Sequence, residues 1–258
     1  MPAMTGPRST ARMAGSIRTF DAFRNPGFRL FWPSNFFVTL ARWTQMTLLL
    51  WMVLGLTESP FRVALVGFFA MLPMLLLGIV GGMLADRVNR RALLMLTQSA
   101  NVVGSVTMTV LLLVGAAQYW HAYLAVLLAG TSWALDQPSR RSVLHDLVGR
   151  SGVTNALALD HVGANASRAI GPALAGLMIS TAGVGGGYVV ISLFYISSLV
   201  LLGRVKLTTA RTRSLGARNV LRSLSEGFRY VRGNNTIMAV VVITAVMNLL
   251  LFQSLQMM

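Results

Sequence analysis

The sequence has no cysteine, a single lysine and few acidic residues. Its 258 residues include 22 Lys and Arg but only 7 Asp and Glu, and charged residues make up 11% of the chain. Without cysteine the chain forms no disulfides, thiolate nucleophiles or cysteine-based metal sites. An ordinary globular domain carries about a quarter charged residues. A water-soluble domain of this length is therefore excluded.

Long stretches of the sequence contain no charged residue. A bilayer core about 30 Å thick needs roughly 20 apolar residues in a helix. Four runs meet this length, and two of them are long enough for a helical hairpin. They are 63–85, 92–135, 169–203 and 236–258. A polar aromatic turn at 118–121 and a glycine cluster at 183–187 divide the two longest runs. Because the runs are continuous rather than alternating, they predict helices and not membrane strands.

These runs predict an all-α, polytopic membrane helix bundle with six transmembrane helices and the start of a seventh. The predicted spans are 30–56, 63–85, 92–115, 120–138, 156–182, 185–203 and 236–258. The predicted parts of the chain are an N-terminal tail at 1–29, a six-helix bundle at 30–203, a linker at 204–235 and a truncated seventh helix at 236–258.

The basic residues alternate between the two sides of these spans. Of the 22 basic residues, 19 lie in the tail and in the second-to-third, fourth-to-fifth and sixth-to-seventh loops, whereas the opposite loops hold only Arg62. The positive-inside rule then places the N-terminus in the cytoplasm. These residues face anionic lipid, which accounts for a pI near 11.8 without a nucleic-acid partner.

Within the linker 204–235, apolar residues recur at helical spacing opposite an arginine face. This pattern indicates an amphipathic helix lying in the membrane interface. The helix serves either as a docking element or as a passive connection between two bundles.

At the end of the second span the sequence reads GMLADRVNRR, from Gly82 to Arg91. This segment resembles the G-x-L-A-D-R-x-G-R-R/K signature that joins the second and third helices in the major facilitator superfamily. The matching signature residues include Gly82, Asp86, Arg87, Arg90 and Arg91. Asn89 replaces a glycine of the signature, and asparagine is the next-best residue for a left-handed turn.

The fifth span carries a second signature. The segment GPALAG, with Gly171, Pro172 and Gly176, is similar to the G-P-x-x-G-G element of facilitator exporters, with Ala175 in place of one glycine. In that family the element is associated with antiport. Close packing of small residues is the alternative explanation.

Two further segments are similar to the branch that includes the enterobactin exporter and related bacterial efflux proteins. One is DQPSRR, with Asp136 and Arg140, which we expect in the fourth-to-fifth loop; the other is the opening at 24–32. The resemblance implies a secondary active transporter in the bacterial cytoplasmic (inner) membrane. It also implies proton-coupled export of a small molecule, namely a drug, a siderophore or a hydrophobic metabolite. The basic residue that the family usually carries inside its fourth helix has no counterpart here.

Carriers of this family have twelve helices in two six-helix halves. The sequence contains six predicted spans and the start of a seventh. We therefore expect a complete carrier to need a missing C-terminal half or a second copy of this chain, and a truncated sequence is the favoured explanation.

Four charged residues fall inside predicted spans, namely Arg42, Asp160, Arg168 and, at the cytoplasmic end of 120–138, Asp136. A mid-membrane arginine costs about 2.5–3.5 kcal/mol on insertion scales, and Arg42 and Arg168 have no acidic residue at the same predicted depth. They either line a substrate cavity that attracts an anion, or extend to the cytoplasmic surface or pair with acids in the missing half. Asp160 is the candidate for proton coupling, with a helix-terminal charge as the alternative.

The sequence holds no paired Ser and His, no H-E-x-x-H and no Walker A segment. We therefore expect no enzyme activity, no cofactor and no metal site. The alternatives to a secondary carrier are a six-helix membrane subunit that needs a separate ATPase, and a membrane scaffold that transports nothing.

Overall fold

The computed structural model describes residues 20–87 and 89–205, apart from the side chains of residues 78–88, 150 and 151. The chain divides into two compact units after Ala210, and all described residues belong to the first unit. The predicted tail up to residue 19, the linker with its amphipathic helix from residue 206, and the seventh span at 236–258 lie outside the described residues.

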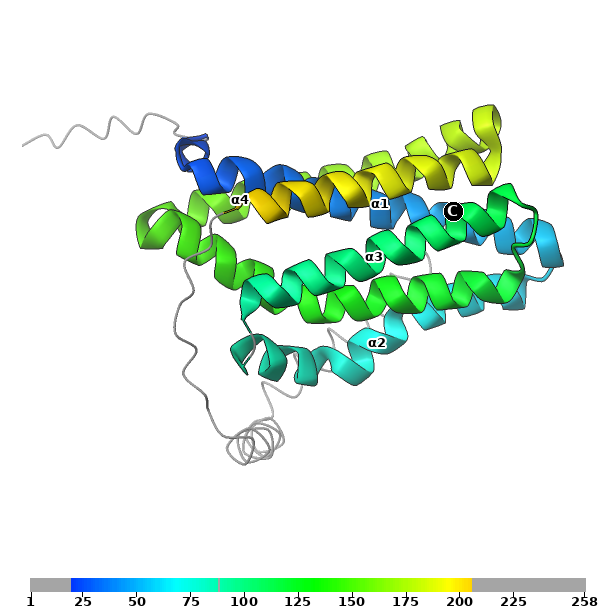
Figure 1. The fold of residues 1–258 in the computed structure, drawn as a ribbon, viewed down its shortest axis with the longest axis horizontal. Helices are drawn as coiled ribbons and strands as arrows, with labels where there is room; N and C mark the ends of the chain where they lie inside the picture. The colour runs from blue at the N-terminus through cyan, green and yellow to red at the C-terminus, as the bar shows by residue number, and fades with distance from the viewer. Residues whose placement is uncertain (1–19, 88, 206–258) are drawn as a thin grey trace, which may run out of the picture. The chain divides into compact units, whose positions relative to one another are not determined.

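Every regular element among the described residues is helical. A short 3-10 helix, η1 (Asp21–Arg24), precedes α1 (Pro26–Thr57), α2 (Pro60–Arg87), α3 (Arg90–Leu113) and α4 (Tyr119–Arg204). Gly149 and Gly183 interrupt α4 with φ values of 66° and 68°, a backbone conformation that glycine adopts readily. At both points the chain folds back on itself (Figure 1). We call residues 119–148, 150–182 and 184–204 the first, second and third stretches of α4.

The helix ends follow from local sequence. The side chain of Asn25 caps α1 by accepting hydrogen bonds from the backbone N–H groups of Gly27 and Phe28, and Pro26 supplies a residue without an N–H at the first helical position. α1 ends at Thr57, and the C-cap residue Glu58 has a left-handed φ of 48°. Asn89 caps α3, because its side-chain oxygen accepts hydrogen bonds from the backbone N–H groups of Arg91 and Ala92. Its φ of −55° shows that our expectation of a left-handed turn at Asn89 is wrong.

Four stretches among the described residues are long and apolar enough to cross a membrane: Pro26–Thr57, Pro60–Leu77, Arg90–Leu113 and Gly152–Arg204. The first stretch of α4, which we predicted to contain a span at 120–138, is not one of the four. It carries polar and charged side chains that are buried against other helices. The all-helical membrane bundle is thus confirmed, whereas the number of six spans stays a prediction.

α4 holds the bundle together, because it packs against each of α1, α2 and α3. Leu48, Tyr188 and Tyr195 lie in a hydrophobic cluster near the Gly183 turn, and Phe28 and Leu144 lie in a second cluster near the Gly149 turn. Large apolar side chains also cover the outer surface, with α2 exposing most of several leucine and phenylalanine side chains. An apolar exterior of this kind suits contact with lipid rather than water.

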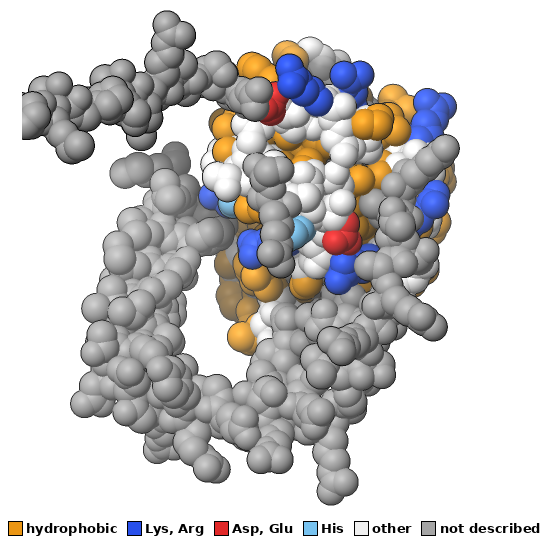
Figure 2. Space-filling view, turned by 90° about the vertical axis from the view of Figure 1, so that its left-hand side faces the viewer, with side chains coloured by type: hydrophobic (Ala, Val, Ile, Leu, Met, Phe, Trp, Pro, Cys, Tyr) orange, Lys and Arg blue, Asp and Glu red, His pale blue; other side chains and the backbone are white. Residues whose placement is uncertain are grey.

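The two ends of the bundle differ in charge. Arg62 lies near the end formed by the α1–α2 connection, the α3–α4 connection and Gly183. The opposite end, which we call the basic end, is formed by η1, the start of α3, the Gly149 turn and the end of α4. Figure 2 looks onto the basic end and shows arginine side chains spread around its rim. The exposed arginines at this end include Arg24, Arg29, Arg91, Arg141 and Arg204.

Glycine allows two close approaches between helices. A Cβ atom built on Gly130 would meet the carbonyl oxygen of Ala70 on α2. A Cβ atom on Gly171 would lie 2.6 Å from the Cβ atom of Trp43 and 3.1 Å from the backbone nitrogen of Thr44 on α1. Gly176, which belongs to the same sequence signature as Gly171, has no such neighbour within 4 Å among the described residues. Close packing therefore accounts for Gly171 but not for Gly176.

The two glycines provide a matched pair of substitutions. We expect Gly171→Ala to lower the stability of the folded protein by about 1–3 kcal/mol, because the new methyl group forces the backbone of α1 away. Gly176→Ala meets open space and gains helix propensity, so its melting temperature stays equal to that of the unaltered protein or rises. Thermal unfolding of both variants in the same detergent measures the difference. Equal melting temperatures would contradict this account of Gly171.

Candidate functional site

A cluster of charged and polar side chains lies inside the bundle, between α3 and the first stretch of α4. The carboxylate of Asp136 is fully buried, and Arg140, one turn further along, is 6% exposed. The Nη2 atom of Arg140 lies 3.4 Å from Oδ2 of Asp136. Thr97 donates to the other carboxylate oxygen, and the side-chain amide of Gln98 donates to Oδ2 over 3.2 Å. Two neutral donors of α3 therefore hold the same carboxylate as the arginine.

This arrangement corrects the placement of Asp136 and Arg140 in a loop. The helix continues through Pro138 and turns only at Gly149. The run of charges together with a proline predicted a cytoplasmic turn. Because Asp136 and Arg140 are four residues apart, however, they neutralise one another on one helix face and enter the interior together.

Arg42 of α1 joins this cluster. Its guanidinium lies within electrostatic range of Asp136 and Arg140, and its Cζ atom lies 5.3 Å from the centre of the Trp133 ring. The expectation that no acidic residue shares the depth of Arg42 is therefore wrong. The carboxylate comes from a helix that is distant in sequence. Two arginines and one aspartate share the site, which leaves an excess positive charge.

Arg168 lies elsewhere, on the exposed face of the second stretch of α4. Its Cζ atom lies 4.9 Å from the centre of the Trp43 ring, within the range of a cation–π contact. Arg42 and Trp43 are neighbours in α1, so one residue of the pair faces the buried cluster and the other supports Arg168. The two arginines thus make separate contacts, and a shared substrate cavity stays a prediction.

Asp160 lies on the second stretch of α4 and is partly buried. The side-chain amide of Asn35 on α1 donates to its Oδ1 atom. Its neighbour His161 is exposed. Compared with Asp136, this carboxylate is closer to the surface. Its role in proton coupling stays a prediction.

The signature segment 82–91 is described only in part, because Gly82, Asp86 and Arg87 are described by their backbone alone, toward the end of α2. Arg90 forms an ion pair with Asp146 over 2.9 Å, and Arg91 donates to the backbone carbonyl of Gly203 over 2.8 Å. These two arginines therefore connect the start of α3 to the first and third stretches of α4 at the basic end.

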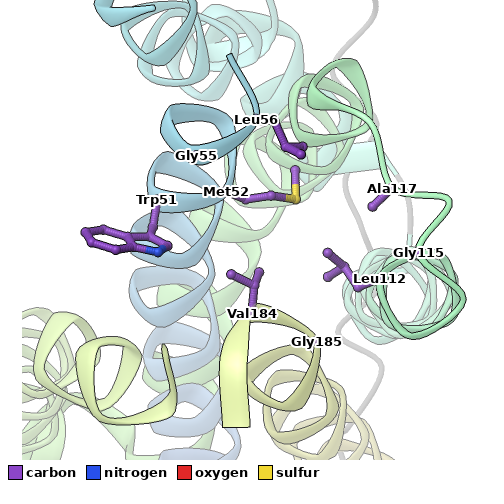
Figure 3. A pocket seen from close by; sticks show the side chains of 9 residues that line it. All are labelled: Trp51, Met52, Gly55, Leu56, Leu112, Gly115, Ala117, Val184 and Gly185. Atoms are coloured by element: carbon purple, nitrogen blue, oxygen red, sulfur yellow. The ribbon is translucent and has the colours of Figure 1, made fainter. Parts of the chain in front are cut away.

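A hollow of about 380 Å³ opens at the end opposite to the basic end. Its lining is apolar and includes Met52, Leu112 and Val184, whose side chains point toward the same space (Figure 3). Gly115 and Gly185 also line it. The sequence did not predict this hollow, because its walls come from the ends of three helical segments.

Polar residues of the predicted third span were also missed. Thr97, Gln98, Asn101 and Ser105 recur at helical spacing and are buried in α3. The polar stripe within a charge-free run was the sequence signal that could have identified these buried residues.

A further buried hydrogen bond lies near Arg42, where the hydroxyl of Tyr195 donates to the side-chain oxygen of Gln45 over 2.8 Å. Among the described residues, no group of three His, Asp or Glu side chains is placed to hold a metal ion.

Comparison with known proteins gives consistent matches. The family model of a transmembrane secretion effector, from the major facilitator superfamily (MFS), matches residues 17–256. The staphyloferrin A transporter of Staphylococcus aureus is 29% identical over 157 residues, which are 59% of this chain and 38% of that protein. The multidrug efflux pump Tap of Mycolicibacterium fortuitum is 28% identical over 196 residues, which are 70% of this chain and 46% of the pump.

An uncharacterized MFS-type transporter of Bacillus subtilis, YfiS, is 24% identical over 69% of this chain and 42% of its own length. The chain thus matches less than half the length of each of these relatives. The family model itself covers most of the chain, and the helices of the structure are those of a multi-pass membrane protein. The chain belongs to the major facilitator superfamily, a family of membrane transporters rather than enzymes, and within it to the transmembrane secretion effectors.

Proposed function

We propose that this chain supplies the first helical bundle of a secondary active exporter that moves small molecules in exchange for protons. The observation that carries the proposal is the buried cluster of Asp136, Arg140 and Arg42 inside a bundle with an apolar exterior. Ionisable groups within a membrane are costly and mark ion or substrate pathways. The names of the relatives, a siderophore transporter and a multidrug efflux pump, support a small organic substrate.

In this proposal the chain crosses the bacterial cytoplasmic membrane six times and begins a seventh crossing. The reversals at Gly149 and Gly183 support three crossings by α4. A second bundle completes the carrier, either from a C-terminal half or from a second copy of the chain. The greater length of the relatives supports this need. Neither an ATPase partner nor a scaffold role finds support in the described residues.

Transport driven by a proton gradient is the direct test. In everted membrane vesicles that contain the full-length product of the gene, we expect staphyloferrin A or the dye ethidium to accumulate when the vesicle interior is acidified without ATP. A protonophore then abolishes the accumulation, because the outward proton gradient is the driving force. Vesicles without the protein serve as the control. Accumulation that requires ATP would instead indicate a carrier with a separate ATPase, and no accumulation of either probe would contradict the proposal.

Charge also supports the proposed orientation, with the basic end and the N-terminus in the cytoplasm. The chain has no cysteine, so each introduced cysteine is a unique target. We expect a membrane-impermeant maleimide to label Glu58→Cys in intact cells and to leave His145→Cys unlabelled until the cells are opened. Both positions are exposed, and they lie near opposite ends of the bundle. The reverse labelling pattern would refute the orientation.

The proposed substrate cavity includes Arg42 and Arg168, which attract an anionic substrate. Arg168 is exposed and receives the anion, whereas Arg42 is balanced in part by Asp136. The signature with Asp86 and Arg87 stays a resemblance to the family, and the element with Pro172 and Gly176 stays associated with antiport through its resemblance. Asp160 stays a candidate for proton coupling.

Removal of each arginine charge tests the cavity. We expect Arg168→Gln to raise the KM for the anion carboxyfluorescein about tenfold, since a lost charged hydrogen bond is worth roughly 1.5–3 kcal/mol. Arg42→Gln raises it less, and neither substitution raises the KM for the cation ethidium. Arg62→Gln is the matched control, because Arg62 lies near the end of the bundle opposite to the basic end. Full transport of carboxyfluorescein by both variants would show that the arginines do not form the cavity.

A further inference from the structure

The groups around Asp136 come from three helices, α1, α3 and α4. Arg140 lies on the same helix, Thr97 and Gln98 lie on α3, and Arg42 lies on α1. Tyr195, on the third stretch of α4, is within electrostatic range of the same carboxylate. Among the described residues, Arg140, Arg42 and Tyr195 are the charged and titratable groups that face Asp136, and Thr97 and Gln98 are neutral donors.

The cluster has more hydrogen-bonding capacity than its contacts use. Within the described part of the chain, buried polar atoms without a hydrogen-bond partner occur on Arg42, Arg140, Gln98, Asn101 and Ser139. Ser139 lies three residues after Asp136, and Asn101 lies three residues after Gln98. Buried polar groups in proteins are nearly always paired. An ion pair with a purely structural role would leave few of these atoms unpaired, whereas a site that changes its protonation state needs spare partners.

Gln98 provides such a partner. When Asp136 is ionised, the Nε2 group of Gln98 donates to it and the Oε1 atom of Gln98 has no partner. When Asp136 is protonated, its hydroxyl group is a donor, and rotation of the Gln98 amide turns Oε1 toward it as the acceptor. The amide group of Gln98 therefore stabilises both the ionised and the protonated form of Asp136, and the helices do not need to move.

Polar side chains also connect the cluster with the opposite end of the bundle. Arg42 is within electrostatic range of Tyr195, and the Tyr195 hydroxyl bonds to Gln45. The hydroxyl of Tyr188 is buried near Tyr195 and near the side chain of Gln45. Tyr188 lies one helical turn from Val184, which lines the apolar hollow. Tyr195, Gln45 and Tyr188 thus place polar groups between the cluster and the part of the bundle that holds the hollow.

We infer that Asp136 is the carboxylate that binds and releases the transported proton. The inference rests on the proposed function and names its coupling residue, in place of Asp160. The proton adds to a carboxylate oxygen of Asp136, the carboxylate becomes a neutral carboxylic acid, and its ion pair with Arg140 is lost. Release of the proton restores the ion pair. Because the carboxylate also accepts from Thr97 and Gln98, each proton transfer changes the pattern of hydrogen bonds between α3 and α4.

Infrared difference spectroscopy of the full-length protein in liposomes tests this inference without any substrate. We expect the carbonyl band of a protonated, buried carboxylic acid to form as the pH falls. The band disappears in Asp136→Asn and remains in Asp146→Asn, the matched control, whose carboxylate lies on the same stretch of α4 but is 42% exposed. In Arg140→Gln the band forms at a higher pH, because the carboxylate loses its cation. A band that survives in Asp136→Asn, or that disappears in Asp160→Asn instead, would overturn the inference.

Asp136→Glu covers the case in which Asp136→Asn does not fold. Glutamate keeps the carboxyl group in a different position, so the band persists with a shifted frequency. An unshifted band would assign the signal to another residue and overturn the inference.

A transport assay separates failure of this inference from failure of the proposed function. In vesicles with Asp136→Asn, ethidium equilibrates down its own gradient, but the acid-driven accumulation seen in the unaltered protein is lost completely. If Asp136→Asn retains that accumulation, the proposed function holds and Asp136 is not the coupling residue. If the unaltered protein shows the infrared band but no accumulation driven by acid, the proposed function fails while Asp136 still exchanges a proton.

Discussion

A charged side chain in apolar surroundings must be compensated by other groups of the protein. The helices of this bundle pack around one cluster of charged side chains that compensate one another. Asp136, Arg140 and Arg42 lie in the interior of a structure whose outer surface is largely apolar. A single arginine at this depth costs about 2.5–3.5 kcal/mol on insertion scales. Sharing one carboxylate between two arginines, with donors from Thr97 and Gln98, reduces that cost. The same contacts set the register between α3 and the first stretch of α4.

Close packing of helices supplies the second constraint. Lipid chains are as apolar as leucine, so the hydrophobic effect does little to bring membrane helices together, and small residues at the contacts take over. Gly130 brings α4 against the backbone of α2, and Gly171 brings it against α1. Ser34 and Ser198 exchange hydrogen bonds between α1 and the third stretch of α4. Through these contacts and the Asp136 cluster, α4, which reverses at Gly149 and Gly183, packs against α1, α2 and α3.

Sequence patterns located the helices well, because a charge-free run is itself the requirement for burial in a membrane. The helices α1, α2 and α3 cover the predicted spans 30–56, 63–85 and most of 92–115. The wrong placement of Asp136 and Arg140 in a loop has the same origin, because it also rests on where the charges lie in the sequence. A rule that reads charges as loop residues fails when two opposite charges neutralise one another one turn apart on a helix. The cap at Asn89 shows a similar limit, since asparagine suits both a left-handed turn and a helix N-terminus.

The sequence by itself determined the all-helical membrane architecture, the signatures of the major facilitator superfamily and the asymmetry of charge between the two ends. These properties depend on composition and local spacing. Only the tertiary structure decided that Arg42 meets a carboxylate 94 positions away in the chain, that Arg168 rests on Trp43 instead, and that Gly171 but not Gly176 packs against α1. Contacts between distant segments depend on the rotation of each helix about its axis, which the packing of all the helices sets together.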